Sequence, residues 1–283
     1  RNFYLHNMFF RKKKFIPYGK HFIDKNDINA VSRALKSEFI TQGPIVELFE
    51  KSISNKVNAK YSIAVNSATS ALHLACLALD IKKDDILWTS AITFVASANC
   101  GRYCGAKIDF IDINMKDGLI DIEKLKEKLE IAKKKNIFII EDACQGIGGG
   151  YEGKKLGTIG HVGAFSFNYY KNMTSGEGGA VVCNNDKIIE RARCAIDPCH
   201  FYWQGRKNSL KPFAANGSRA SEFMGAILNV QLKRLPKMIK KMRLERDKIL
   251  KSTKHLSNFG IKHTPLNSKK YDCGTFAFFT FNR

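Results

Sequence analysis

A lysine with possible catalytic chemistry, Lys171, lies in the segment GAFSFNYYKNMTSGEGG, between a short apolar run and a glycine-rich stretch. A lysine amine held between two strands can form a Schiff base with an aldehyde cofactor. Ser166, five residues earlier, has a hydroxyl that can hold a phosphate oxygen. In a lysine-rich chain, however, a single lysine is more often a solvated surface residue. The assignment of Lys171 therefore depends on two further segments.

The second segment is IFIIEDACQG, in which four apolar residues lead directly to Glu141 and Asp142. An acidic group at the end of a buried strand needs a partner. A protonated pyridine nitrogen would be such a partner, and the ion pair would let a pyridoxal ring act as an electron sink. The alternative is that a carboxylate here only caps the segment that follows.

The third segment is AVNSATSALHL, in which an apolar run ends at Asn66 and a helical pattern begins a few residues later. Backbone N–H groups at a helix start, together with the helix dipole, favour a phosphate. The alternative is an ordinary N-cap by Ser67 or Thr69. Ligand sites of parallel α/β sheets gather at the carboxyl ends of the strands. The three segments together therefore favour a phosphorylated pyridoxal cofactor.

The elements that must position these residues follow from apolar runs that alternate with helical patterns. This alternation predicts a layered α/β fold with a mainly parallel sheet and flanking helices. The predicted strands are the runs 62–65, 85–88, 107–111, 137–140, 163–167 and 179–183. Helices are expected at 70–79, at 121–135 and from 221 onward, where we expect Pro236 to interrupt the helical pattern.

Several motifs in this order resemble the DegT/StrS family of PLP-dependent sugar-nucleotide aminotransferases. They are FITQGPIVELFEKSI, VNSATSALHLA, SAITFVASAN, EDACQ and FSF-x3-KN-x2-SGEGG. The resemblance extends over roughly residues 16–283. It implies the aspartate aminotransferase-like fold of type I. It also implies pyridoxal 5'-phosphate (PLP) as the cofactor and transfer of an amino group, with glutamate the expected donor, to a keto-sugar nucleotide.

The same resemblance implies roles for four residues around the cofactor ring. Lys171 would hold the cofactor covalently and move a proton between the substrate carbon and the cofactor. Asp142 would pair with the pyridine nitrogen. Phe94 would stack on the ring, and Gln145 would lie near its 3-oxygen. A lysine at position 171 favours transamination, because some family members have a histidine there and act as dehydratases.

At the phosphate, the resemblance implies backbone and hydroxyl contacts from Ala68, Thr69 and Ser166. Arg219 would reach the phosphate from the neighbouring subunit, which implies a homodimer with shared active sites. The alternative is that Arg219 forms a pair or a cap within its own chain.

The chain also departs from the family. After Leu129, a strand, a loop and a helix of the family are absent, and the lost strand would lie inside the sheet. Either the sheet closes around the gap or the chain is a deletion form or a fragment. We divide the chain into a tail (1–15), a large PLP-binding domain (16–235) and the start of a truncated small domain (236–283). The tail does not resemble a signal peptide, and Met8 is a plausible internal start.

Composition narrows the range of functions other than an active enzyme. The formal net charge of +21 would suit a nucleic acid or an anionic membrane, but the lysines are spread along the chain rather than interleaved with aromatic residues. No apolar stretch is long enough to span a membrane. The eight cysteines do not have zinc-ligand spacing and suit a reducing, cytoplasmic compartment. The remaining alternatives are an impaired or regulatory PLP-binding relative and a basic nucleic-acid-binding protein.

Overall fold

A computed structural model describes residues 17–132, 137–197, 213–266 and 268–281 of the 283-residue chain. The expected tail 1–15 lies outside the described residues. The helices are α1 (Lys25–Leu35), α2 (Pro44–Val57), α3 (Ala68–Ala78), α4 (Ala96–Tyr103), α5 (Ile122–Ala132), α6 (Asp186–Ile196), α8 (Glu222–Ser252) and the 3-10 helix η1 (Lys254–Phe259). The longer strands are β1 (Tyr61–Val65), β2 (Ile86–Ser90), β3 (Lys107–Ile111), β4 (Ile140–Asp142), β7 (Val162–Ser166) and β8 (Gly179–Cys183). Two small hairpins pair β5 (Gly150–Tyr151) with β6 (Lys154–Lys155), and β9 (Ile261–His263) with β10 (Phe279–Phe281).

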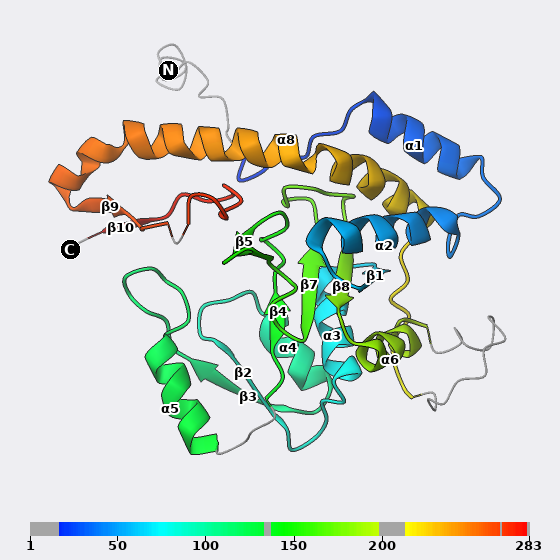
Figure 1. Cartoon of the computed structure of the whole chain (residues 1–283), viewed down its shortest axis with the longest axis horizontal. Helices are drawn as coiled ribbons and strands as arrows, with labels where there is room; N and C mark the ends of the chain where they lie inside the picture. The colour runs from blue at the N-terminus through cyan, green and yellow to red at the C-terminus, as the bar shows by residue number, and fades with distance from the viewer. Residues whose placement is uncertain (1–16, 133–136, 198–212, 267, 282–283) are drawn as a thin grey trace, which may run out of the picture.

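The centre of the molecule is a four-stranded sheet with the order β1-β8-β7-β4 (Figure 1). β4 and β7 are parallel, whereas β8 is antiparallel to both of its neighbours. β1, β7 and β4 therefore run in one direction, and their carboxyl ends lie at the same edge of the sheet. The antiparallel direction of β8 was not apparent from the sequence, because a short apolar run does not encode the direction of its strand.

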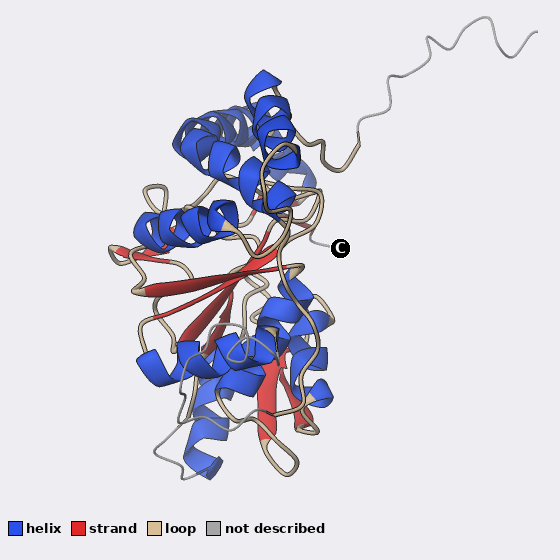
Figure 2. Ribbon diagram, turned by 90° about the vertical axis from the view of Figure 1, so that its right-hand side faces the viewer, coloured by secondary structure: helices blue, strands red, loops and turns tan. Residues whose placement is uncertain are grey.

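Helices cover both faces of this sheet (Figure 2). Along β1, Ile63 and Val65 pack into the core formed with α3 and α6, whereas Ala64 packs into the core formed with α2 and α8. β7 repeats the alternation, with Ala164 on the first side and Phe165 on the second. A strand that is apolar on both faces reads as a continuous apolar run, which is why the sequence pattern located these strands.

The sheet is divided at the position where the sequence predicts a lost strand. β2 and β3 form a separate parallel pair, and within the described residues no strand pairs with the free side of β4 or of β2. The predicted strand 137–140 was misplaced: the observed strand is Ile140–Asp142, which shares only Ile140 with the prediction. β2 and β3 are also more exposed than the buried strands that we expected, with Ile86 and Phe110 both exposed. The sheet has not closed around the gap.

α8 is a single helix of 31 residues that passes through Pro236. The prediction that Pro236 would interrupt the helix was wrong. Proline removes one backbone donor from a helix, but the side chains of Leu235 and Ile239, on either side of it, are buried and hold the helix against the sheet. Among the described residues, no helix has both the length and the apolar character needed to cross a bilayer.

Candidate active site

The strand register brings the predicted phosphate-binding residues to one level of the sheet. Gly179 of β8 is opposite Val65 of β1 on one side and Ser166 of β7 on the other. Val65 leads into the start of α3, where Ala68 and Thr69 are the first helical residues. Ser166, whose side chain is buried, therefore lies two strands away from this helix start, at the same edge of the sheet.

Gly179 allows the start of α3 to approach the sheet closely. A Cβ atom at this position would lie 2.6 Å from the carbonyl carbon and oxygen of Ser67 and 2.8 Å from the nitrogen of Ala68. Ser67 is the N-cap of α3, since its hydroxyl accepts a hydrogen bond from Ser70 N–H at 3.1 Å. The first N–H groups of a helix have no partner within the helix, so a capped α3 still directs backbone donors toward an anion at this edge.

The two acidic residues at the end of β4 have different partners. Glu141 accepts hydrogen bonds from three backbone N–H groups of the following loop, at 2.7 Å from Gly157, 2.5 Å from Ile159 and 2.6 Å from Gly160. Glu141 is therefore the carboxylate that holds the next segment. Asp142 instead accepts from the Ser97 hydroxyl at 2.5 Å and from Cys144 N–H at 3.3 Å, and it is exposed at the sheet edge.

Lys171 lies in the loop after β7 and is half-buried. Its backbone N–H donates to Asn168 O at 3.0 Å, and the neighbouring Asn172 side chain donates to Ile147 O at 3.1 Å. Burial raises the pKa of the Cys144 thiol, the Asp142 carboxylate raises it further, and the Lys171 ammonium opposes the rise. Lys171 and Asp142 thus act on the Cys144 thiol in opposite directions.

The two other residues predicted at the ring are accessible. Phe94 is 70% exposed and immediately precedes α4, and its carbonyl accepts a hydrogen bond from Ser97 N–H at 3.0 Å. Gln145 is also exposed, and its backbone carbonyl accepts from the thiol of Cys273 at 3.5 Å. An exposed aromatic ring beside Asp142's partner Ser97 is available for stacking.

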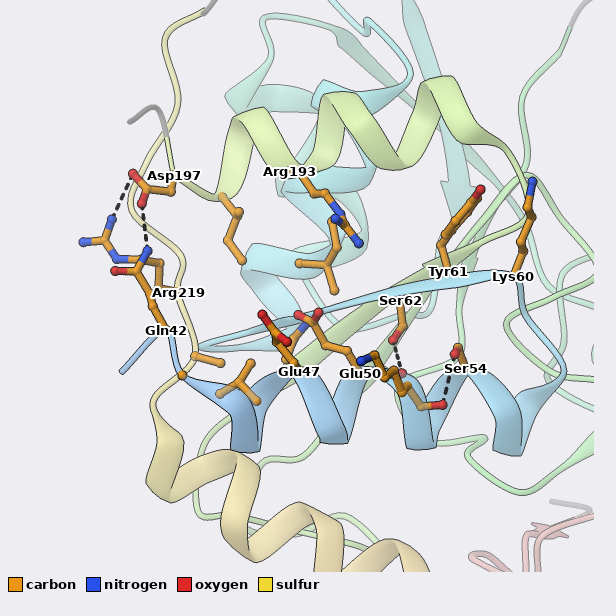
Figure 3. A pocket seen from close by; sticks show the side chains of 17 residues that line it. Gln42, Glu47, Glu50, Ser54, Lys60, Tyr61, Ser62, Arg193, Asp197 and Arg219 are labelled. Atoms are coloured by element: carbon orange, nitrogen blue, oxygen red, sulfur yellow. Dashed lines mark hydrogen bonds and ion pairs between the residues drawn. The ribbon is translucent and has the colours of Figure 1, made fainter. Parts of the chain in front are cut away.

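Arg219 lies at one end of a cavity of about 430 Å³ between α2, β1 and α6 (Figure 3). Its guanidinium forms an ion pair with Asp197 at 3.1 Å, and Gln42 donates to the other oxygen of Asp197 at 3.1 Å. Its backbone forms a bridge with Val65, so residue 219 is attached to the strand that leads into α3. Within this single chain, Arg219 has the local pairing that we considered as its alternative role.

Three residues with contacts at these sites were not apparent from the sequence. Ser97 donates to Asp142, Asp197 pairs with Arg219, and Gln42 donates to Asp197. Gln42 and Ser97 do lie inside the motifs TQG and FVASAN, but nothing in their spacing indicates a partner 155 or 45 residues away. The seven cysteines of the described residues are free thiols, and these residues contain no cluster of side chains suited to a metal.

Comparison with known proteins identifies the family of this chain. The family described as the DegT/DnrJ/EryC1/StrS aminotransferase family matches residues 21–130 and 127–280. This chain belongs to that family. The two matched segments meet beside Leu129, where the sequence predicts that a strand and its flanking segments are absent.

Individual family members include enzymes that act on sugar nucleotides. The chain is 39% identical over 204 residues to the UDP-4-amino-4,6-dideoxy-N-acetyl-beta-L-altrosamine transaminase of Campylobacter jejuni subsp. jejuni serotype O:23/36 (strain 81-176), covering 63% of this chain and 54% of the relative. It is 30% identical over 241 residues to the GDP-perosamine synthase of Caulobacter vibrioides (strain ATCC 19089 / CIP 103742 / CB 15), covering 75% of this chain and 63% of the relative. The chain thus spans little more than half the length of the first of these relatives.

Solved structures share the fold. An aminotransferase from Psychrobacter cryohalolentis superimposes with a TM-score of 0.81 at 25% identity, covering 92% of this chain and 75% of that protein. A GDP-4-keto-6-deoxymannose-3-dehydratase with a trapped PLP-glutamate geminal diamine superimposes with a TM-score of 0.87 at 22% identity, covering 95% and 80%. The predicted fold, that of the PLP-dependent aminotransferases, is confirmed.

Proposed function

We propose that this chain binds PLP and transfers an amino group from an amino acid, with glutamate the expected donor, to a keto-sugar nucleotide. The observation that carries the proposal is that β4 and β7 are parallel neighbours. Asp142 at the end of β4 and the segment from Ser166 to Lys171 after β7 therefore leave the sheet at the same edge as the capped start of α3. Family membership and relatives that are named as sugar transaminases support the same reaction.

The residues present fit this cofactor. The contact of Gly179 with Ser67 and Ala68 creates a close backbone cradle that a side chain at position 179 would fill. Backbone N–H groups at the start of α3 and the Ser166 hydroxyl would bind the phosphate. Asp142 would bind the ring nitrogen, and Phe94 would cover one face of the ring.

The cofactor supplies an aldehyde and an electron sink when bound. Lys171 would supply the amine that holds the aldehyde, and its amine would also move a proton at the substrate carbon. Asp142 keeps a proton on the ring nitrogen by pairing with it. We propose a homodimer in which Arg219 reaches the phosphate of the second chain, and a reducing compartment such as the cytoplasm, which the free thiols support.

A second candidate function is PLP binding without turnover. The divided sheet favours it, because β4 carries Asp142 yet, in the part of the chain that the structure describes, pairs with a neighbour on one side only. A strand with one neighbour positions its end less firmly than a strand inside a sheet.

Visible absorption separates these functions. Purified chain mixed with PLP should develop a visible band that persists through gel filtration, and Lys171→Ala should lose it while the control Lys154→Ala, an exposed lysine of β6, keeps it. A band with amino transfer supports the transaminase, and a band without transfer supports the second function. A chain that stays colourless would contradict both and favour the basic nucleic-acid-binding alternative.

A further inference from the structure

The hydroxyl of Ser97 is a buried polar group to which the proposed function has given no role. Ser97 is 8% exposed, and its oxygen lies 2.5 Å from Oδ2 of Asp142 and 3.1 Å from Oγ1 of Thr93. An ionised carboxylate can only accept hydrogen bonds. Ser97 therefore donates to Asp142, and Thr93 donates to Ser97, so the three side chains form a directed chain of hydrogen bonds that ends on the carboxylate.

Asp142 has few other supports. β4 contains three residues, it is hydrogen-bonded to β7 on one side, and within the described residues no strand lies on its other side. Oδ1 accepts one bond, from Cys144 N–H at 3.3 Å. The Ser97 hydroxyl thus contacts Asp142 from the side of β4 that faces β2. Ser97 belongs to α4, the helix that follows β2.

The helix that carries Ser97 is firmly placed. Ala96 and Cys100, on either side of Ser97, are both buried in the core shared with α3. Ser97 N–H also donates to the carbonyl of Phe94 at 3.0 Å. One turn of chain therefore carries both Phe94, whose ring would cover the cofactor, and Ser97, whose hydroxyl donates to the Asp142 carboxylate.

We infer that Ser97 is a positioning residue that orients Asp142 toward the ring nitrogen, in place of the neighbouring strand that β4 lacks. The inference rests on the proposed function, because it assumes that Asp142 pairs with that nitrogen. Each carboxylate oxygen has two lone pairs, so Asp142 can accept from Ser97 and from the ring nitrogen at the same time.

The first test measures PLP affinity by titration of the visible band for Ser97→Ala and Ser97→Thr. Ser97→Ala should weaken binding about tenfold, since a hydrogen bond to a charged group contributes about 1.4 kcal/mol or more. Ser97→Thr keeps the hydroxyl and should remain within about twofold of wild type. The matched control is Ser54→Ala, which removes an equally buried hydroxyl that donates to Lys51 O in α2. Equal affinities for Ser97→Ala and Ser54→Ala would overturn the inference.

The second test needs no cofactor. Urea unfolding of Ser97→Ala, Asp142→Ala and the double variant gives the coupling between the two side chains. The double variant should lose clearly less stability than the sum of the two single losses. Additive losses would overturn the inference even if PLP binds. A wild-type chain that never binds PLP would refute the proposed function instead, and the coupling would then decide whether Ser97 supports Asp142.

Discussion

The carboxylate of Glu222 accepts a hydrogen bond from the backbone N–H of Gly43 at 3.1 Å, although 179 positions separate the two residues. The same carboxylate accepts from Ile45 N–H at 2.8 Å and from Val46 N–H at 3.0 Å, and Glu222 is fully buried. A charge at the start of α2 is favoured by the dipole of that helix. The first residue of α8 thereby fixes the first turn of α2.

Replacement of Glu222 by alanine should lower the free energy of unfolding by about 3–5 kcal/mol, because three buried N–H groups lose their acceptor. Urea unfolding measures this loss. Glu47→Ala, which removes an exposed carboxylate from the same helix, is the control and should change the stability by less than about 0.5 kcal/mol. A loss at Glu222 no larger than this would show that the three hydrogen bonds contribute little.

Replacement of Asp142 by alanine should weaken PLP binding at least as much as Ser97→Ala does. With the site saturated by PLP, amino transfer should still be slower on the order of a hundredfold or more, because the protonated ring nitrogen loses its partner. Asp142→Asn preserves the shape of the side chain and should be slowed to a similar extent, since the charge is what the ring nitrogen needs. Single-turnover rates from the bound cofactor check this directly. Near-normal rates in Asp142→Ala would remove the residue from the mechanism.

The proposed cross-subunit role of Arg219 can be tested by mixing two inactive proteins. Lys171→Ala and Arg219→Ala each damage one component of a shared site, so a mixed dimer contains one intact site and one site with both defects. Random exchange should restore about a quarter of the wild-type activity, because half of the dimers are mixed and each has one intact site of two. No recovery despite demonstrated subunit exchange would assign Arg219 to its own chain, in agreement with its ion pair to Asp197.

Glu50, which faces the cavity of Figure 3, should make the stability depend on pH. Burial raises its pKa from 4.5 to about 7, while its hydrogen bond from Ala64 N–H and the nearby Arg193 oppose the rise. Because the folded-state pKa exceeds the unfolded one, the folded chain binds the extra proton between these values, and stability falls as the pH rises through this window.

Glu50→Gln keeps an oxygen that can accept from Ala64 N–H and removes the titration. The stability of the variant relative to wild type should therefore rise between pH 4 and pH 8. The expected rise in this difference is roughly 1–3 kcal/mol in the free energy of unfolding. Unfolding curves at both pH values provide the measurement, and Glu38→Gln, at an exposed carboxylate that does not line this cavity, is the control. A difference between Glu50→Gln and wild type that does not change with pH would refute the assignment.

Apolar runs located the buried strands well, because β1, β7 and β8 are covered on both faces and leave few polar positions. They could not reveal that β8 is antiparallel, since direction depends on which strands pair. The sequence also did not predict that the helix continues through Pro236, because the burial of the side chains on both sides of the proline outweighs the hydrogen bond that it removes. In the candidate site, the motifs predict roles for Lys171 and Asp142, but the contact of Ser97 with Asp142 depends on how α4 packs.

The division between the two sheets has a mechanical consequence. No backbone hydrogen bond joins β4 to β2 in the described residues, so the two halves of the site are connected through packed helices and the side chain of Ser97. Phe94 belongs to one half, whereas Asp142 and Lys171 belong to the other. A ligand that contacts both halves would add a connection between them. Occupancy of the site would therefore stabilise the folded chain.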